Sequence, residues 1–453
     1  MEIFNEINNK LNEIIWGPVT LGVLLIVGIL FSVMTKFFQI RGIGLWFSKT
    51  IGRAFKKGKN TGVSAFEAMS TALSGCMGTG NIVGVATAVA IGGPGAVFWM
   101  WVSAFLGMMT AFAENVLAIK FRQQDGNGIF YGGPMYYIEK GLKSKWLAVL
   151  FSVFCLGASF GIGNLTQSNS VANVVNTTVN VDNIYTSVIL AVLVGIVIFG
   201  GIKRLVKVTS TIVPFMVLLY VISGIVVISF NAGNLGNVFN SIFMGAFGFE
   251  QAVGGISGAL ILNAMRTGVS RGVFSNEAGM GSSAIAHGAS NTKEPVVQGM
   301  WGIFQVFVDT MLGCSITALV ILSTGALGSG KEGVELTSYA FSSVFGIGGE
   351  IIIFINIILL AFSTLITWEY YGEQSLKYLT KGKGSLVYKL IFCAVIIFGG
   401  IMKIDIVWTI SDTLNGLMII PNIIALFILS PIVKKEFKKY MGRKTQKQEI
   451  IDV

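Results

Sequence analysis

A polar, glycine-rich run interrupts an otherwise apolar segment at residues 63–91. The run consists of Ser74, Gly75, Cys76, Met77, Gly78, Thr79, Gly80 and Asn81, with Gly84 following after two apolar residues. Each glycine is roughly 1 kcal/mol worse than alanine inside a helix, so the run predicts a broken helix. In a bilayer, an unwound backbone is tolerated where it lines a cavity, and its freed amide and carbonyl groups can then bind a ligand.

A second apolar segment, at residues 259–287, contains a similar interruption. Its residues are Phe274, Ser275, Asn276, Glu277, Ala278, Gly279, Met280, Gly281, Ser282 and Ser283. The chain has eleven apolar segments, described below. Without the first of them, ten remain, and the two interruptions fall in the first segment of each five-segment half. Paired breaks of this kind are typical of secondary transporters with inverted repeats, which bind substrate and coupling ion near the bilayer midplane. The alternative is that the glycines only allow close helix crossings.

Broken helices favour a particular class of ligand. The N-terminus of a half-helix offers unpaired amides and a positive dipole end to a carboxylate, whereas carbonyl ends suit a cation. The predicted ligand is therefore a zwitterion or anion together with a small cation. Ser363 and Thr364, one turn after Leu360, add two hydroxyl oxygens that a hard cation could use. Alternatively, these hydroxyls bond back to the preceding turn of their own helix.

Five carboxylates lie in or near apolar segments: Glu67, Glu114, Glu277, Asp309 and Glu369. An ionisable group at membrane depth indicates a functional site by default. Glu114 and Asp309 lie deepest. A proton-coupled transporter needs one of them beside the ion site, whereas a structural role would pair them with the backbone or with each other. His287 is the only histidine, which argues against a histidine metal cluster and against Ser–His catalysis.

The composition indicates which elements must position these groups. Of 453 residues, 53% are apolar and 12% are charged, the mean hydropathy is +0.75, and 57 are glycine. Soluble domains have about 25% charged residues, so the chain is predicted to be an all-α polytopic membrane protein rather than a soluble enzyme. The net charge of +10 does not predict a nucleic-acid partner, because no soluble basic face is expected. The four cysteines lie in apolar segments without metal-ligand spacing.

Eleven apolar segments are expected to cross the membrane. They lie near residues 17–34, 63–91, 94–121, 146–172, 184–201, 205–230, 259–287, 296–323, 338–371, 385–402 and 404–432. With this count, all but five of the 32 Lys and Arg residues fall on one side; the exceptions are Lys10, Arg266, Arg271, Lys331 and Lys403. The positive-inside rule then predicts an external N-terminus and a cytoplasmic C-terminus in the cell membrane.

This count divides the chain into five parts. Residues 1–40 form the external N-terminus and an extra helix, and 62–230 form the first five-helix repeat. Residues 231–258 are expected to form a re-entrant or interfacial helix on the outer side. The second five-helix repeat spans 259–432, and the basic cytoplasmic tail, 433–453, is expected to contact anionic membrane lipid.

Two runs of this sequence resemble a known family. The run from Gly92 to Gly107, GGPGAVFWMWVSAFLG, is similar to the signature of the alanine or glycine:cation symporter family, also called sodium:alanine symporters. The run from Ser275 to Ser282, SNEAGMGS, is similar to a second stretch of that family. The resemblance implies a leucine-transporter-type fold, with a core of two inverted five-helix repeats and here one added N-terminal helix.

The resemblance also implies roles for individual residues. The amides near Thr79 and Gly80 would bind a substrate carboxylate, with Gln167 closing that site, and Phe274 and Trp368 would wall the side-chain pocket. The Phe274 carbonyl, Ser275 and Asn276 would face the substrate amino group. One sodium site would use the carbonyls of Ser74, Met77 and Leu360 and the hydroxyls of Ser363 and Thr364, and Asn81 would bind a second sodium in relatives that have one.

The expected function is import of small neutral amino acids, alanine and glycine, by symport with sodium through alternating access. No cofactor is expected besides sodium as the coupling ion. One alternative is a proton-coupled amino-acid symporter of the same fold. Another, from a different class, is a channel or a non-transporting amino-acid sensor, although this chain lacks an obvious output domain for a sensor. Ion-replacement uptake assays would distinguish these functions.

Overall fold

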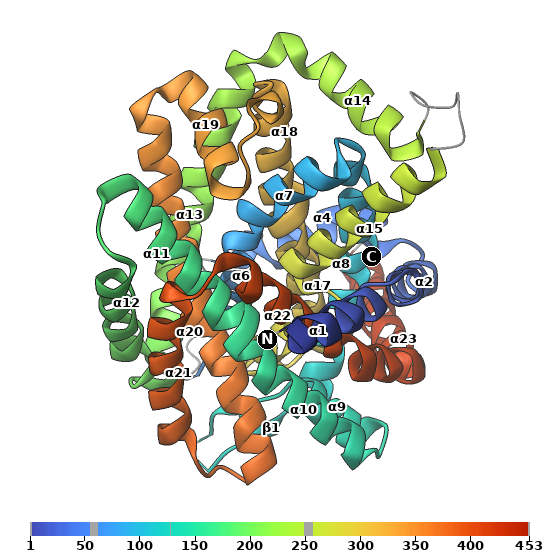
Figure 1. Cartoon of the computed structure of the whole chain (residues 1–453). Helices are drawn as coiled ribbons and strands as arrows, with labels where there is room; N and C mark the ends of the chain where they lie inside the picture. Colours follow the sequence, from blue (N-terminus) through green and yellow to red (C-terminus); the bar gives the residue numbers. More distant parts are fainter. Residues whose placement is uncertain (1, 55–61, 127, 249–256, 452–453) are drawn as a thin grey trace.

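The computed structural model describes residues 2–54, 62–126, 128–248 and 257–451, and nearly all of them are helical (Figure 1). The first half contains α1 (Glu2–Ile15), α2 (Pro18–Met34), α3 (Phe38–Arg41), α4 (Ile43–Lys49), α5 (Ile51–Ala54), α6 (Ala65–Cys76), η1 (Thr79–Asn81), α7 (Val83–Gly92), α8 (Gly95–Phe121), α9 (Pro134–Gly141), α10 (Lys145–Phe160), η2 (Gly161–Leu165), α11 (Thr166–Val179), α12 (Asn183–Ile198) and α13 (Gly201–Phe230). A short antiparallel pair, β1 (Gln123–Gln124) and β2 (Phe130–Tyr131), connects α8 to α9.

The second half contains η3 (Ala232–Asn234), α14 (Leu235–Phe247), α15 (Ser257–Asn276), α16 (Ser283–Gly288), α17 (Pro295–Val306), η5 (Phe307–Cys314), α18 (Ser315–Ser323), η6 (Ala326–Ser329), α19 (Gly333–Phe345), α20 (Ile347–Thr380), α21 (Ser385–Ile401), α22 (Ile404–Leu417) and α23 (Ile419–Ile451). Two segments, η2 and η5, are π-helical and lie within longer helical runs. Segments of this kind are rare in proteins, and those that occur are often found at functional sites.

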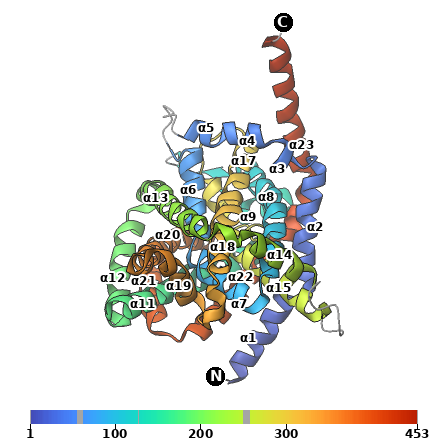
Figure 2. The same cartoon turned by 90° about the horizontal axis from the view of Figure 1, so that it is seen from above.

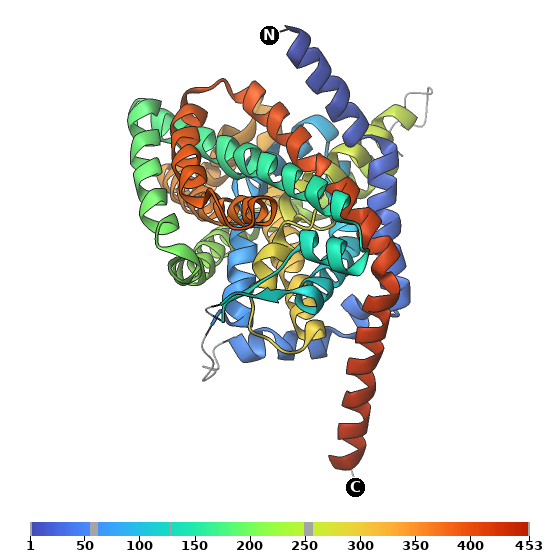
Figure 3. The same cartoon turned by 90° about the horizontal axis from the view of Figure 1, so that it is seen from below.

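Seven helical runs of the described chain are long and apolar enough to cross a membrane: Lys10–Met34, Gly95–Phe121, Lys145–Val179, Gly201–Phe230, Pro295–Ser323, Ile347–Thr380 and Val407–Arg443. The bent pair of α6 with η1 and α7 adds an eighth, and α12 and α21 are apolar but shorter. The all-α polytopic fold is therefore confirmed, whereas the count of eleven crossings stays a prediction. Figures 2 and 3 place the two ends of the chain at opposite ends of the molecule.

Two long helices organise the core. Helix α8 packs against α2, α15 and α17, and α20 packs against α10, α11 and α19. The π-helical residue Gly163 is required for one of the closest contacts, because a Cβ at that position would lie 2.3 Å from the Cβ of Trp368 on α20. The chain therefore brings η2 directly against the helix that carries the Ser363–Thr364 pair.

The structure divides one predicted segment differently. Residues 338–371 were expected to form one crossing, but Gly346 ends α19 with a φ of 55°, and the crossing is α20, Ile347–Thr380. In the region 231–258, the described part forms η3 and α14, and α14 packs on α8; residues 249–256 lie outside the described residues. The basic tail continues α23 as a helix that projects from the body in Figures 2 and 3.

Candidate functional site

The first predicted break is present between α6 and α7. Helix α6 ends at Cys76. The next two residues, Met77 and Gly78, leave the helical conformation, and the chain turns through η1 into α7 with a bend of 59°. The side chain of Asn81 accepts a hydrogen bond from the Gly78 amide at 3.1 Å, which closes this turn. All residues from Ala68 to Gly84 are buried, so the break lies inside the protein.

The second predicted break is present between α15 and α16. After Asn276, the residues Glu277, Gly279 and Gly281 take φ values of 58°, 93° and 82°, in the left-handed region. Glycine adopts that region without strain, whereas Glu277 does so at a cost of about 1–3 kcal/mol. The Glu277 carboxylate is held on both oxygens, by the Trp368 indole at 3.0 Å and by the Ser282 hydroxyl at 2.5 Å.

Helix α20 places one of its predicted ion ligands, Thr364, in contact with the first break. The Thr364 hydroxyl donates to the carbonyl of Ser74 at 2.8 Å and lies 3.4 Å from the carbonyl of Met77. The Ser363 hydroxyl donates to the Leu360 carbonyl at 2.9 Å, within its own helix. Thr364 and the two freed carbonyls thus form one cluster of oxygens, and the atoms that Ser363 contacts here are the Leu360 carbonyl and the Met216 sulfur.

Gln167 closes the first break from the α11 side. Its side-chain Oε1 accepts from the Thr79 amide at 3.2 Å, and its Nε2 donates to the Ile162 carbonyl at 3.0 Å. A Cβ at Gly78 would lie 2.8 Å from the Thr364 hydroxyl and 3.1 Å from Gln167 Oε1, so any larger residue would push these side chains away from the break. The Thr79 hydroxyl is buried and has no hydrogen-bond partner in the part of the chain that the structure describes.

Asn81 lies in a polar cluster around the carboxylate of Asp309 on η5. One Asp309 oxygen accepts from the Asn81 amide at 2.9 Å, and the other accepts from Ser275 and Thr310 at 2.8 and 2.6 Å. Asp309 is fully buried, and no salt bridge involving it is found among the described residues. The sequence indicated that Asp309 is deep in the membrane but did not place it beside Asn81, because that contact joins residues far apart in the chain.

Phe274 and Trp368 approach different residues of the first break, Gly80 and Gly75. The Phe274 ring packs near Gly80, where a Cβ would lie 3.3 Å from the ring. Trp368 is fully buried, and its indole Nε1 donates both to the Gly75 carbonyl at 3.2 Å and to Glu277. Trp368 therefore joins the α6 end of the first break to the second break. Asn276 donates to Thr310 at 3.2 Å.

Two aromatic rings and an ion pair lie together near the α7 end of the first break. The sequence analysis did not predict this group. The rings of Phe274 and Trp408 stack with centroids 5.7 Å apart, and the Arg271 guanidinium lies near both rings. Arg271 also forms two hydrogen bonds of 3.0 Å with Asp412 on α22. Beside this group, a cavity of about 780 Å³ is lined by α7, α11 and the start of α19, and by Arg271 and Trp408. In the sequence, Arg271 is one of five basic residues on the predicted external side.

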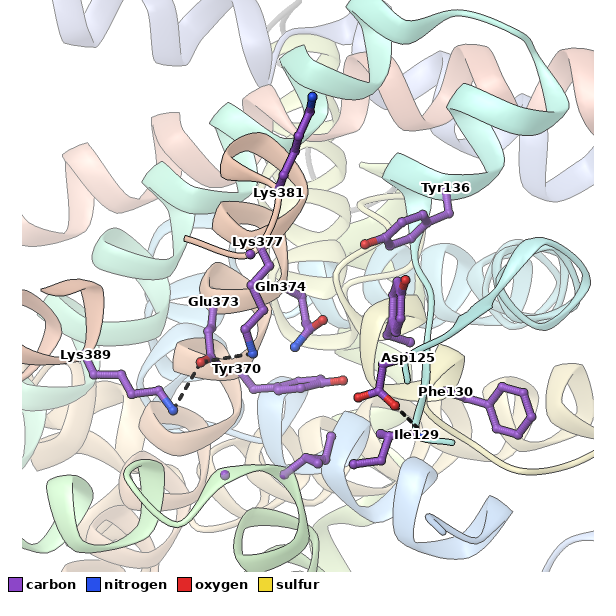
Figure 4. A pocket seen from close by; sticks show the side chains of 14 residues that line it. Asp125, Ile129, Phe130, Tyr136, Tyr370, Glu373, Gln374, Lys377, Lys381 and Lys389 are labelled. Carbon is purple, nitrogen blue, oxygen red and sulfur yellow. Dashed lines mark hydrogen bonds and ion pairs between the residues drawn. The ribbon is translucent and has the colours of Figure 1, made fainter. Parts of the chain in front are cut away.

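Another cavity, of about 580 Å³, lies between the β1–β2 connection and the last turns of α20 (Figure 4). Figure 4 shows the Glu373 carboxylate between the amines of Lys377 and Lys389, each 3.2 Å away. Lys389 also donates to the carbonyl of Ile198, so this cluster ties α20 to α21 and α12. None of the predicted ligand residues lines this cavity.

The arrangement defines a class of protein: two broken helices meet in the core, with freed backbone groups, hydroxyls and a carboxylate gathered between them, in a polytopic bundle. That is the architecture of a secondary transporter. The model of the sodium:alanine symporter family matches residues 1–452, and the chain belongs to this family of amino-acid:cation symporters. The resemblance noted in the sequence is thereby confirmed, and the protein is a multi-pass membrane transporter.

The relatives cover nearly the whole chain. The sodium/alanine symporter AgcS of Methanococcus maripaludis is 42% identical over 445 residues, which are 96% of this chain and 97% of that protein. The probable sodium/glutamine symporter GlnT of Bacillus subtilis is 39% identical and covers 98% of this chain and 92% of its own. Among solved structures, MhsT in complex with L-phenylalanine has a TM-score of 0.56 and 13% identity over 84% of this chain and 99% of that chain, a similarity of fold.

Proposed function

We propose that this protein imports small neutral amino acids, alanine and glycine, in symport with sodium. The observation that carries the proposal is the contact between the Thr364 hydroxyl and the carbonyls of Ser74 and Met77 freed by the first break. Hard cations prefer oxygen ligands of this kind. The family match supports symport of an amino acid with a cation, and the name of AgcS pairs sodium with alanine.

The first sodium site would use the carbonyls of Ser74, Met77 and Leu360 and the hydroxyls of Ser363 and Thr364. On binding, each hydroxyl would turn its hydrogen away from its present carbonyl partner and point a lone pair at the ion. A second cation site would use Asn81 together with Asp309 and Ser275, which add a full negative charge. Burying that charge without a cation costs several kcal/mol, which favours a bound cation or proton there.

The substrate would lie between the two breaks. Its carboxylate would bind the amides near Thr79 and Gly80, and the unpartnered Thr79 hydroxyl and Gln167 would complete that site. Its amino group would face the Phe274 carbonyl, Ser275 and Asn276. Phe274 and Trp368 would wall the side-chain pocket and exclude large side chains by steric contact.

Alternating access would open the α7 end and the α6 end of the molecule in turn. We propose that Phe274, Trp408 and the Arg271–Asp412 pair act as the closed gate between the breaks and the 780 Å³ cavity, which Arg271 and Trp408 line. We assign the α7 end to the exterior and the α6 end, with the C-terminus, to the cytoplasm. This orientation rests on the distribution of Lys and Arg residues between the two sides.

Uptake by purified protein in liposomes tests the proposal. An inward sodium gradient should accumulate labelled alanine with saturable kinetics, and unlabelled glycine should compete. Accumulation that follows a proton gradient and ignores sodium would replace sodium with proton coupling. A current without saturable uptake would instead indicate a channel, and binding without flux would indicate a sensor.

A further inference from the structure

A chain of buried side chains runs from α17 through α16 and α6 to the second break. His287 on α16 lies between two glutamines of α17: its Nε2 is 2.8 Å from Gln305 Oε1, and its Nδ1 is 2.5 Å from Gln298 Nε2. Gln305 Nε2 then donates to the Cys76 sulfur at 2.8 Å, and Cys76 lies 3.6 Å from the Asn276 carbonyl. All five residues are buried.

The hydrogen bonds of this chain all run in one direction. Gln305 Oε1 can only accept, so the His287 Nε2 must carry the hydrogen, and Nδ1 is then the acceptor for the Gln298 amide. The side-chain Nε2 of Gln305 donates to the Cys76 sulfur, and the Cys76 thiol donates to the Asn276 carbonyl. Neutral His287 thus accepts a hydrogen bond from Gln298 and donates one to Gln305, both on α17.

The chain joins the two half-helices on the proposed cytoplasmic side of the breaks. Cys76 is the last residue of α6, and His287 is on α16, so both halves are tied to the uninterrupted helix α17. The segments flanking the same halves meet again where the Asn291 amide, after α16, donates to the Val63 carbonyl, before α6, at 2.8 Å. Arg122, at the end of α8, donates to the neighbouring Ser290 carbonyl. If α6 or α16 swings outward about its break, the chain centred on His287 must separate.

We propose that His287, with Gln298 and Gln305, is the clasp that holds α6 and α16 closed on the cytoplasmic side. His287 is a positioning residue: it touches neither the proposed ion ligands nor the substrate groups, and it sets how often the cytoplasmic path opens. This inference rests on the proposed alternating-access function. It gives the single histidine and the two glutamines of α17 a role that the binding site does not require.

The thiol of Cys76 is a native reporter for this clasp. In inside-out vesicles, a membrane-impermeant maleimide should alkylate Cys76 only when the clasp opens, and peptide mass spectrometry can follow the rate at Cys76. Cys155, which is buried against α20 outside the clasp, is the internal control. His287→Ala removes two hydrogen bonds, each contributing about fivefold to the closed state, so the rate at Cys76 should rise at least about tenfold.

Two variants separate the clasp from general loosening. Ile285→Ala removes a buried apolar side chain from the same helix and leaves the hydrogen-bond chain intact, so it should change the rate at Cys76 by less than about twofold. His287→Gln, which keeps a donor toward Gln305, should give an intermediate rate. Equal rates in wild type and His287→Ala, or an equal rise in Ile285→Ala, would overturn the clasp.

Sodium distinguishes failure of this inference from failure of the proposed function. If sodium occupies the first break in the closed state, it should slow alkylation of Cys76 in the wild type. Sodium-driven uptake with unchanged labelling in His287→Ala would reject the clasp alone. Absence of sodium-driven uptake and of any sodium effect on Cys76 would reject the proposed function, whatever His287→Ala does.

Discussion

The two helix breaks look alike in sequence, but their polar groups are satisfied differently. At the first break, the freed backbone groups pair with neutral side chains, among them Gln167 and Thr364, and the Thr79 hydroxyl has no partner among the described residues. At the second break, the protein supplies its own carboxylate: Glu114 Oε1 accepts from the Gly279 amide at 3.0 Å and from Asn422 at 2.6 Å. The first break therefore has neutral partners that a ligand could replace, whereas the backbone of the second break is held by a carboxylate, of which Oε2 has no partner among the described residues.

This difference suggests a division of labour. A break that is capped by a buried carboxylate keeps its shape, because removing the cap would leave backbone donors unpaired. A break whose partners are neutral and exchangeable can trade them for an ion or a substrate at small cost. Mutations of the carboxylate cap at Gly279 should therefore act mainly on stability, and mutations at the first break should act mainly on transport.

The largest effect is expected at Glu114. Glu114→Leu would leave the Gly279 amide and the Asn422 side chain without their acceptor, and should lower the free energy of unfolding by about 3 kcal/mol. Glu114→Gln keeps a carbonyl oxygen in place and should lose less. Thermal unfolding in detergent, followed by size-exclusion chromatography, measures both. If Glu114→Leu unfolds like the wild type and only transport is lost, the second break is a ligand site and the comparison fails.

The next effect tests the tight packing of the first break. In Gly78→Ala, the new methyl group would lie 2.8 Å from the Thr364 hydroxyl, at a cost of about 2 kcal/mol, and should slow transport roughly thirtyfold. Gly84→Ala is the matched control, because the nearest atom to its Cβ would be 4.0 Å away. Initial rates of alanine uptake compare the two. Similar rates in both variants would show that the break does not need its present contact with α20.

A smaller effect is expected for the proposed ion ligand. Thr364→Ala removes the hydroxyl that contacts Ser74 and Met77, and should raise the sodium concentration for half-maximal uptake about tenfold. The preference for alanine over larger amino acids should not change. Ser363→Ala should shift the sodium dependence in the same direction by less, since its hydroxyl contacts its own helix and Met216. A sodium response that stays at the wild-type value in Thr364→Ala contradicts the assignment of this site.

The smallest effect is expected at Thr79. Thr79→Val keeps the shape but removes a hydroxyl that has no partner, so the folded protein should be as stable as the wild type. The apparent affinity for alanine should fall about fivefold, because one hydrogen bond to the substrate carboxylate is lost. Thr79→Ser should restore it. Uptake kinetics and thermal unfolding together decide the point: a loss of stability without a change in affinity would make Thr79 a structural residue.

The sequence predicted the parts of the site that follow from local chemistry. Both breaks were visible because glycine and polar residues interrupt apolar segments, and Thr364 was visible as a hydroxyl inside another. The contact of Asn81 with Asp309 was not, since it depends on how η5 turns its residues toward a helix far away in the chain. The covering pair of Arg271 and Asp412 was missed for the same reason. The end of α19 at Gly346 did have a local signal, a glycine cluster, which the hydropathy of the segment obscured.

Helix α23 runs unbroken from Ile419 to Ile451, and its 33 residues span about 50 Å. Its last turns stand clear of the bundle in Figure 3. A fluorescent protein joined to this helix without a flexible linker would be mounted at a fixed angle to the transporter. The projecting part of α23 is therefore a natural place for an optical label, with which polarised fluorescence could report how the whole molecule is oriented in a supported bilayer.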